Sequence, residues 1–192
     1  REAAALAVNQ KEIVANLYGG IGQVADTFLI SSLLESNVDP KFRIAYNPER
    51  ARKLLDEAGW TMAAGGVRAK DGKPLQVKLW TQNGTEFKRV TEVVQAQLKA
   101  IGIQADITVL DPSTINAQYR KRTEHQLAVR AYSWTNADII DWFFGGKRLG
   151  YPNVSMFNDP AAEALNEKAM KGSRTWDERV ASRVVVEQRI ER

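Results

Sequence analysis

The stretch from residue 75 to 109 constrains the fold more than any other part of the sequence. It opens with apolar residues at every second position from Leu75 to Leu79, which is the period of a half-buried strand. Segment 85–101 then has apolar residues at helical spacing, with Thr85 as a predicted cap and Gly102 as the stop, before the period of two returns over 103–109. Strand, helix and strand in this order predict a right-handed crossover between two parallel strands. The chain is therefore expected to be an α/β protein.

A second segment, NPERARKLLDEAGW at 47–60, specifies a helix from start to stop. Asn47 is a good N-cap, and Pro48 stands at the first helical position, where its missing N–H costs nothing. The apolar residues form one stripe, at positions 51, 54, 55 and 58. Gly59 suits the left-handed position after a helix, and Trp60 can pack back against it. Because every residue has a structural reason, we interpret this helix as scaffold and not as a functional site.

The remaining periodicities complete a small mixed, partly parallel sheet flanked by helices. Residues 23–46 show no clear period and are interpreted as an ordered loop, with room for one short helix. The other predicted elements are a helix over 2–18, a helix from Pro112 to about Arg122, a third strand over 127–134, a short helix over 138–145, a helix from Asp159-Pro160 to Gly172, and a last helix with Thr175 and Glu178 as its capping box. We take residues 1–192 as a single domain.

Composition excludes several classes of site. The 192 residues contain no cysteine and one histidine, His125, which rules out disulfides, zinc–thiolate sites and two-histidine metal sites. We therefore expect no metal and no cofactor. The net charge is +4, and the basic residues are scattered, with no run longer than Arg120–Arg122, so nucleic acid is not an expected partner. No glycine-rich phosphate loop and no nucleophile elbow occurs.

The candidate binding site follows the third predicted strand. In open α/β sheets, ligands gather beyond the carboxyl ends of the strands, where segments 81–84, 111–114 and 133–141 are expected to lie. The third of these lies within SWTNADIIDWFF at 133–144, which concentrates aromatic and acidic residues. Arg130, Tyr132 and Trp134 share one face of the predicted strand, and Asp138 and Asp141 follow it. An arginine beside aromatics and carboxylates suits a zwitterionic or polar organic ligand.

Each of these residues also has a structural interpretation. Trp134 is as well suited to a core as to a pocket. Asp138 could cap the helix that follows it, and Arg130 could pair with a structural acid such as Asp106. Asp138 and Asp141, three residues apart, could also be a carboxylate pair for hydrolysis, although nothing else in the sequence supports this.

Several segments taken together resemble a known family. NPERARKLLDEAGW, GGVRAKDGKPLQVKLWT, VVQAQLKAIGIQADI and REAAALAVNQKEIVANLYGG are similar to successive segments of the family 5 extracellular solute-binding proteins, the dipeptide- and oligopeptide-binding receptors of ABC importers. HQLAVRAYSWTNAD and YPNVSMFNDPAAEALNEKA match the family more loosely. The resemblance implies that the chain is one lobe of a type II periplasmic-binding-protein clamshell, the second lobe, cut at both ends.

The resemblance also implies roles for the candidate residues. Trp134 would line the pocket, Asp138 would receive a ligand ammonium group, and Arg130 would lie near a ligand carboxylate. The other expected ligand-binding residues are Tyr132, Asp141 and Asn153. The family often has Asp-Pro shortly after the tryptophan, where this chain has Ile139-Ile140-Asp141, so the sequence leaves open which of the two acids faces the ligand.

The function implied is capture of peptides or similar small polar solutes for import. A clamshell binds its ligand between two lobes, so the missing first lobe would complete the site, and the fragment alone should bind weakly or not at all. The expected partners are that lobe and the membrane permease, and the expected form is a monomer in the periplasm or anchored outside the cell by lipid. This reading makes the chain a non-enzyme. The alternatives are a hydrolase lobe that uses Asp138 or Asp141, and a nucleic-acid-binding module.

Overall fold

The computed structural model describes residues 1–25, 28, 45–121, 125–133, 138–173, 175, 177, 178, 181, 185 and 186. Two compact units are present: Arg1–Val24, Ile44–Ile115 and Glu124–Ala131 form the first, and the described residues of the remainder form the second. The single domain over 1–192 stays a prediction. None of the helices in the described ranges combines the length and apolar character needed to cross a bilayer.

The elements follow one another as the sequence analysis expects, with the differences given below. In chain order they are α1 Glu2–Leu6, α2 Gln10–Leu17, α4 Pro48–Glu57, β1 Thr61–Met62, β2 Arg68–Lys70, β3 Lys73–Pro74, β4 Gln76–Gln82, α5 Thr85–Lys99, β5 Gln104–Leu110, α6 Pro112–Arg120, β6 Leu127–Val129, α7 Ile139–Phe144, the 3-10 turn η2 Gly146–Arg148, and α8 Pro160–Gly172.

The first unit is built on a parallel sheet of order β5-β4-β6, which confirms the predicted crossover. Leu79 at its centre lies opposite Ile107 on β5 and Leu127 on β6. The strands β1, β2 and β3 form a separate antiparallel sheet. Together they confirm an α/β fold with a small, partly parallel sheet.

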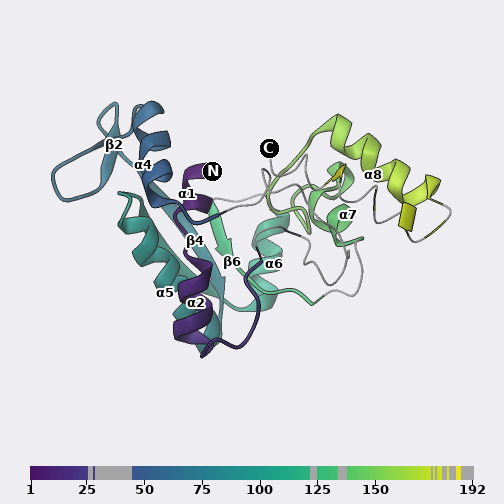
Figure 1. Ribbon diagram of the computed structural model, residues 1–192, viewed down its shortest axis with the longest axis horizontal. Helices are drawn as coiled ribbons and strands as arrows, with labels where there is room; N and C mark the ends of the chain where they lie inside the picture. The colour runs from purple at the N-terminus through teal and green to yellow at the C-terminus, as the bar shows by residue number, and fades with distance from the viewer. Residues whose placement is uncertain are drawn as a thin grey trace. The chain divides into compact units, whose positions relative to one another are not determined.

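One face of the parallel sheet carries the core. Figure 1 shows α5 alongside β4, and the helix packs on both β4 and β5. Leu79 and Ala105 point from the strands toward Val94 and Leu98 of α5, and all four are buried. Burying each of the valine and leucine side chains stabilises the fold by about 1.5–3 kcal/mol. The apolar residues at every second position of the strand sequences are therefore the ones that face α5.

The helix α4 forms as its sequence specifies. The Asn47 side chain accepts a hydrogen bond from the Arg50 backbone at 2.9 Å, and Pro48 is the first helical residue. Ala51 is completely buried, and Gly59 adopts the left-handed conformation with φ of 82°. The predicted start and stop are confirmed, and so is the apolar face at positions 51, 54 and 55, whereas Ala58, the fourth residue of the predicted stripe, is exposed.

The N-terminal segment is two helices and not the single predicted one. Asn9 begins a new helix, because its side chain accepts from the Glu12 backbone at 3.2 Å. Its own backbone N–H donates to the Gln97 side chain at 3.0 Å instead of continuing α1. The Leu6 carbonyl accepts from the Asn47 backbone at 2.8 Å. Contacts with two distant segments thus break a helix that its apolar pattern would continue.

One predicted cap and one other predicted boundary are wrong. Thr85 is the first residue of α5 and Gly84 takes the N-cap position, at a φ of 129° that suits glycine. The third strand ends at Val129, not at residue 134, because its pairing with β4 ends at Thr81.

Most of segment 23–46 lies outside the described residues. The Thr175 hydroxyl accepts from the Glu178 backbone at 3.2 Å, which is half of the predicted capping box.

Candidate ligand-binding site

The parallel sheet brings the ends of β4, β5 and β6 to one edge, as predicted. Two of the three segments expected there, 81–84 and 111–114, make hydrogen bonds that stabilise the fold. The Asn83 backbone donates to the Leu110 carbonyl at 2.8 Å. The Asp111 carboxylate accepts from the backbones of Ser113 and Thr114, both at 3.0 Å, at the start of α6. Hydrogen bonds from the side chains of Ser113 and Thr114, together with these backbone bonds, lower the pKa of Asp111 well below its usual range, because they favour the charged form.

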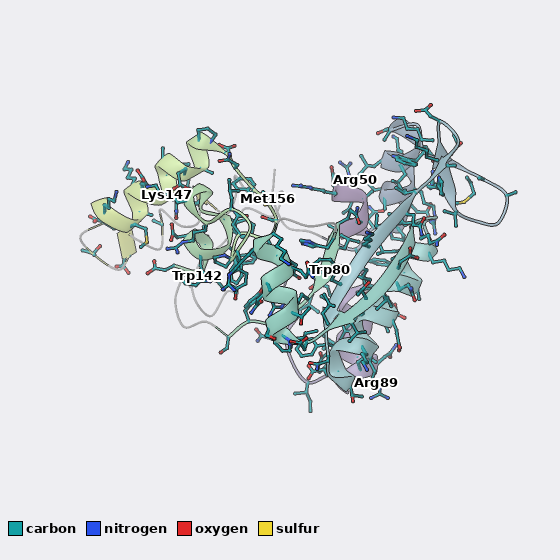
Figure 2. The ribbon with its side chains drawn as sticks, turned by 180° about the vertical axis from the view of Figure 1, so that it is seen from behind. Arg50, Trp80, Arg89, Trp142, Lys147 and Met156 are labelled. Atoms are coloured by element: carbon teal, nitrogen blue, oxygen red, sulfur yellow. The ribbon has the colours of Figure 1, made fainter. Side chains whose placement is uncertain are left out.

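Arg130 follows β6 at this edge and is half-buried. Its proposed structural partner Asp106 lies opposite Lys78, near the start of β4, and accepts from the Gln104 side chain at 3.2 Å. The strand register therefore separates Asp106 from Arg130, and the interpretation of these two as an ion pair is wrong. On the same sheet, Trp80, labelled in Figure 2, is buried. Its ring stacks on His125 at 4.9 Å between centroids.

Tyr132 belongs to the second unit and rests on an aromatic cluster. Its ring centroid lies 4.4 Å from that of Phe143, which is buried, while Tyr132 itself is 43% exposed. Phe144 continues the cluster, 4.7 Å from Phe28 and 5.9 Å from Phe157. One side of the Tyr132 ring is thus supported by the protein and much of the rest is accessible. Trp134, the fellow candidate on the predicted strand, lies outside the described residues.

Asp138 stands at the N-cap position of α7 and is half-buried. Its backbone carbonyl accepts from the Trp142 backbone at 3.2 Å, but its side chain makes no capping hydrogen bond. The interpretation of Asp138 as a side-chain cap is therefore wrong. Its role as receptor of a ligand ammonium group stays a prediction.

Asp141, one turn later, has both carboxylate oxygens engaged. Oδ2 accepts from Nε and Nη2 of Arg148 at 2.9 and 2.7 Å, and Oδ1 accepts from the Asn166 amide at 2.6 Å. The Arg148 guanidinium also lies 4.6 Å from the centroid of the Trp142 ring, a residue of α7 labelled in Figure 2. Asp141 and Trp142 thus hold the same arginine.

Asn153 is completely buried and its amide is used in full by its surroundings. Nδ2 donates to the carbonyls of Gly145 and Phe157 at 3.1 and 2.8 Å. Oδ1 accepts from the Ser155 hydroxyl at 3.0 Å and from the Phe157 backbone at 3.2 Å. These bonds fix the loop between η2 and α8, and a ligand-binding role for Asn153 stays a prediction.

The sequence analysis did not single out Arg148 or Asn166. Arg148 lies in a glycine-containing turn and Asn166 in the middle of α8, where polar residues are ordinary. Only the presence of a half-buried acid at Asp141 could have indicated that a cation must be near. In the described parts of the chain, no three acidic or histidine side chains come close enough to hold a metal ion.

Comparison with known proteins places the chain in a family. The profile described as "Bacterial extracellular solute-binding proteins, family 5 Middle" matches residues 1–147. The chain belongs to this family. It is 37% identical over 123 residues to the nickel-binding periplasmic protein of Escherichia coli (strain K12), covering 62% of this chain and 23% of that protein. It is 35% identical over 125 residues to the oligopeptide-binding protein AppA of Bacillus subtilis (strain 168), covering 62% of this chain and 22% of that protein.

The fold agrees with the family. The structure of AppA from Bacillus subtilis in complex with a nonapeptide matches 99% of this chain and 38% of that one, with a TM-score of 0.85 and 25% identity. The predicted membership and the predicted fold of a type II periplasmic binding protein are therefore confirmed. The chain spans only 22–23% of the length of the two relatives named here.

Proposed function

We propose that this chain is part of the substrate-binding component of an ABC importer for peptides or similar small polar solutes. The family is one of extracellular solute-binding proteins, and its members are binding proteins, not enzymes. The match over 99% of this chain to AppA in complex with a nonapeptide carries the proposal. We further propose a monomer that works with a membrane permease, in the periplasm or tethered outside the cell by lipid.

Within this function, the proposed ligand-binding residues are Asp138 for an ammonium group, Arg130 for a carboxylate, and Trp134 and Tyr132 for the apolar part of the ligand. Asp141 supports this assignment indirectly, because Arg148 and Asn166 engage both of its oxygens. The same contacts argue against a hydrolase, which would need both carboxylates of the pair available to the reacting groups. Scattered basic residues give no support to nucleic acid as a ligand.

A binding experiment on the complete natural protein that contains this chain tests the proposal. Calorimetry would compare di- to nonapeptides that have a free amino terminus with the same peptides acetylated at that terminus. We expect binding of one length class, and a loss of tenfold or more on acetylation, since a hydrogen bond to a charged group contributes about 1.5–3 kcal/mol. Nickel with free histidine is the competing probe, because one relative is a nickel-binding protein.

Variants then test the residues. Asp138→Asn should remove the preference for the free amine. Arg130→Ala should weaken the binding of peptides with a free carboxyl terminus more than the binding of amidated peptides. Asp71→Asn, in the turn between β2 and β3, removes the same charge elsewhere and should change neither affinity. Unchanged affinity in both Asp138→Asn and Arg130→Ala would show that the site assignment is wrong. Binding of nickel with histidine but of no peptide would reject the peptide function.

A further inference from the structure

We infer that Asp141 is a positioning residue and not a ligand contact: through Arg148 and Asn166 it holds α7 in the orientation that places Asp138. The inference rests on the proposed function, because it concerns the site in which Asp138 is proposed to bind an ammonium group. We call Asp141, Arg148 and Asn166 the α7 clamp.

The contacts of Asp141 leave little of it for a ligand. Its side chain is 21% exposed, and both oxygens already accept from Arg148 or Asn166. A ligand ammonium group would have to displace one of these donors. Removing the partner of a partly buried charge is costly, since the remaining charge has lost much of its water. The carboxylate therefore serves the protein itself.

The clamp connects α7 to two other elements. Arg148 belongs to η2 and Asn166 to α8, so the Asp141 side chain of α7 is bonded to both of these elements. Arg148 is in turn held against Trp142, the next residue of α7. Because α7 has only six residues, its own hydrogen bonds cannot keep it ordered, and its orientation depends on such contacts.

The turn after α7 is fixed by the same neighbours. The Gly145 backbone donates to the Asp141 carbonyl at 3.0 Å, and its carbonyl accepts from Asn153 at 3.1 Å. The next backbone N–H, of Gly146, donates to the Glu163 carboxylate at 2.8 Å. A Cβ at Gly145 would lie 2.5 Å from the Asp141 carbonyl oxygen, so the turn can approach the helix this closely only with glycine. A rigid turn at one end and the clamp on one side leave α7 a single orientation.

The test compares four variants of the complete natural protein: Asp141→Asn, Arg148→Gln, the double variant, and Asp138→Asn. Peptide affinity is measured by calorimetry with free-amine and N-acetylated peptides, and hydrogen exchange of residues 139–144 is measured without ligand. Lys147→Gln is the matched control for Arg148→Gln, because Lys147 is the preceding cation of η2 and its ion pair with Glu167 of α8 is exposed, where such pairs contribute little to stability. It should change neither measurement.

We expect Asp141→Asn and Arg148→Gln each to weaken binding about tenfold and to speed exchange in α7. The double variant should lose no more peptide affinity than the single variant with the larger loss, because both substitutions remove the same interaction. The preference for the free amine should survive in all three, whereas Asp138→Asn should abolish it without faster exchange. Loss of that preference in Asp141→Asn, or additive losses in the double variant, would overturn the inference.

The exchange measurement separates this inference from the proposed function. If the unmodified protein binds no free-amine peptide, the proposed function fails, but the clamp is still judged by exchange in α7. Faster exchange in both Asp141→Asn and Arg148→Gln would then still support it. Exchange equal to that of the unmodified protein in either variant would overturn it.

Discussion

The guanidinium of Arg68 donates from Nε to the backbone carbonyl of Ile101 at 2.9 Å, although the residue is only 3% exposed. Another nitrogen donates to the Trp60 carbonyl at 2.6 Å and pairs with Asp56. One side chain thus pairs with Asp56 in the last turn of α4 and bonds to carbonyls just beyond α4 and α5, near helix ends where a cation is favoured. It fastens the scaffold helix to the helix of the crossover.

Replacing Arg68 by Met should therefore reduce the free energy of unfolding by about 2–4 kcal/mol, because two carbonyls lose their donor in a buried position. Denaturant unfolding of the chain would measure the loss. Lys70→Met is the control: Lys70 donates to the Ala58 carbonyl at an exposed position, so its loss should stay within about 0.5 kcal/mol. Equal losses in the two variants would show that Arg68 is no more than a surface cation.

Gly102→Ala should also destabilise the chain, by a steric route. Gly102 has φ of 87°, and a Cβ there would lie 2.6 Å from Cγ of Arg68. Gly66 has a similar φ of 80° but nothing within 4 Å of its Cβ position, so Gly66→Ala pays only the left-handed strain of about 1–2 kcal/mol. We expect Gly102→Ala to lose clearly more in denaturant unfolding, and equal losses would mean that Arg68 moves aside freely.

Arg68 also shows where sequence reasoning stops. The start and stop of α4 and most of its apolar stripe were predicted, because they lie within fourteen consecutive residues. The partners of Arg68 lie 8, 12 and 33 residues away, and no local pattern indicates them. The same holds at the N-terminus, where the helix break at Asn9 depends on contacts with Gln97, 88 residues on, and between Leu6 and Asn47.

The candidate site divides in the same way. The aromatic and acidic composition of 133–144 is visible in the sequence, and so is the edge of the sheet at which Arg130 lies. Whether an acid is available to a ligand depends on partners such as Arg148 and Asn166, which stand 7 and 25 residues from Asp141. Periodicity orders side chains along an element but does not pair elements, so these contacts required the structure.

The N-cap of α4 gives a smaller, local prediction. Asn47→Ala removes the acceptor for the Arg50 backbone and should reduce the free energy of unfolding by about 1 kcal/mol. Asn47→Ser keeps an oxygen in place and should be nearly neutral. Thermal unfolding of both variants checks this, and a neutral Asn47→Ala would mean that water satisfies the helix end equally well.

Asp111 should make stability depend on pH in the acid range. Its pKa in the folded chain is lowered by hydrogen bonds from Ser113 and Thr114, so the charged form stabilises the fold. That contribution is fully present above the unfolded pKa of about 4 and is lost as the pH falls toward the folded value. Asp111→Asn keeps a side-chain oxygen at the cap but cannot titrate. The difference in free energy of unfolding between Asp111→Asn and Asp111→Ala should therefore not change with pH. Unfolding from pH 7 to 2 should show the advantage of the unmodified chain over Asp111→Ala shrinking below pH 4, and a constant difference would contradict the assignment.

Asn153→Leu should disrupt the second unit selectively. The substitution keeps the volume but removes four hydrogen bonds from a fully buried position, and it leaves the carbonyls of Gly145 and Phe157 without their donor. A loss of about 3 kcal/mol or more follows from unsatisfied buried polar groups. Hydrogen exchange read by mass spectrometry should rise in peptides from 139–157 and stay unchanged in those from 75–110, because Asn153 bonds only within its own unit among the described residues. Ser155→Ala removes one of the four bonds and should show a small rise in the same peptides. Equal increases in both sets of peptides would show that the two units unfold together.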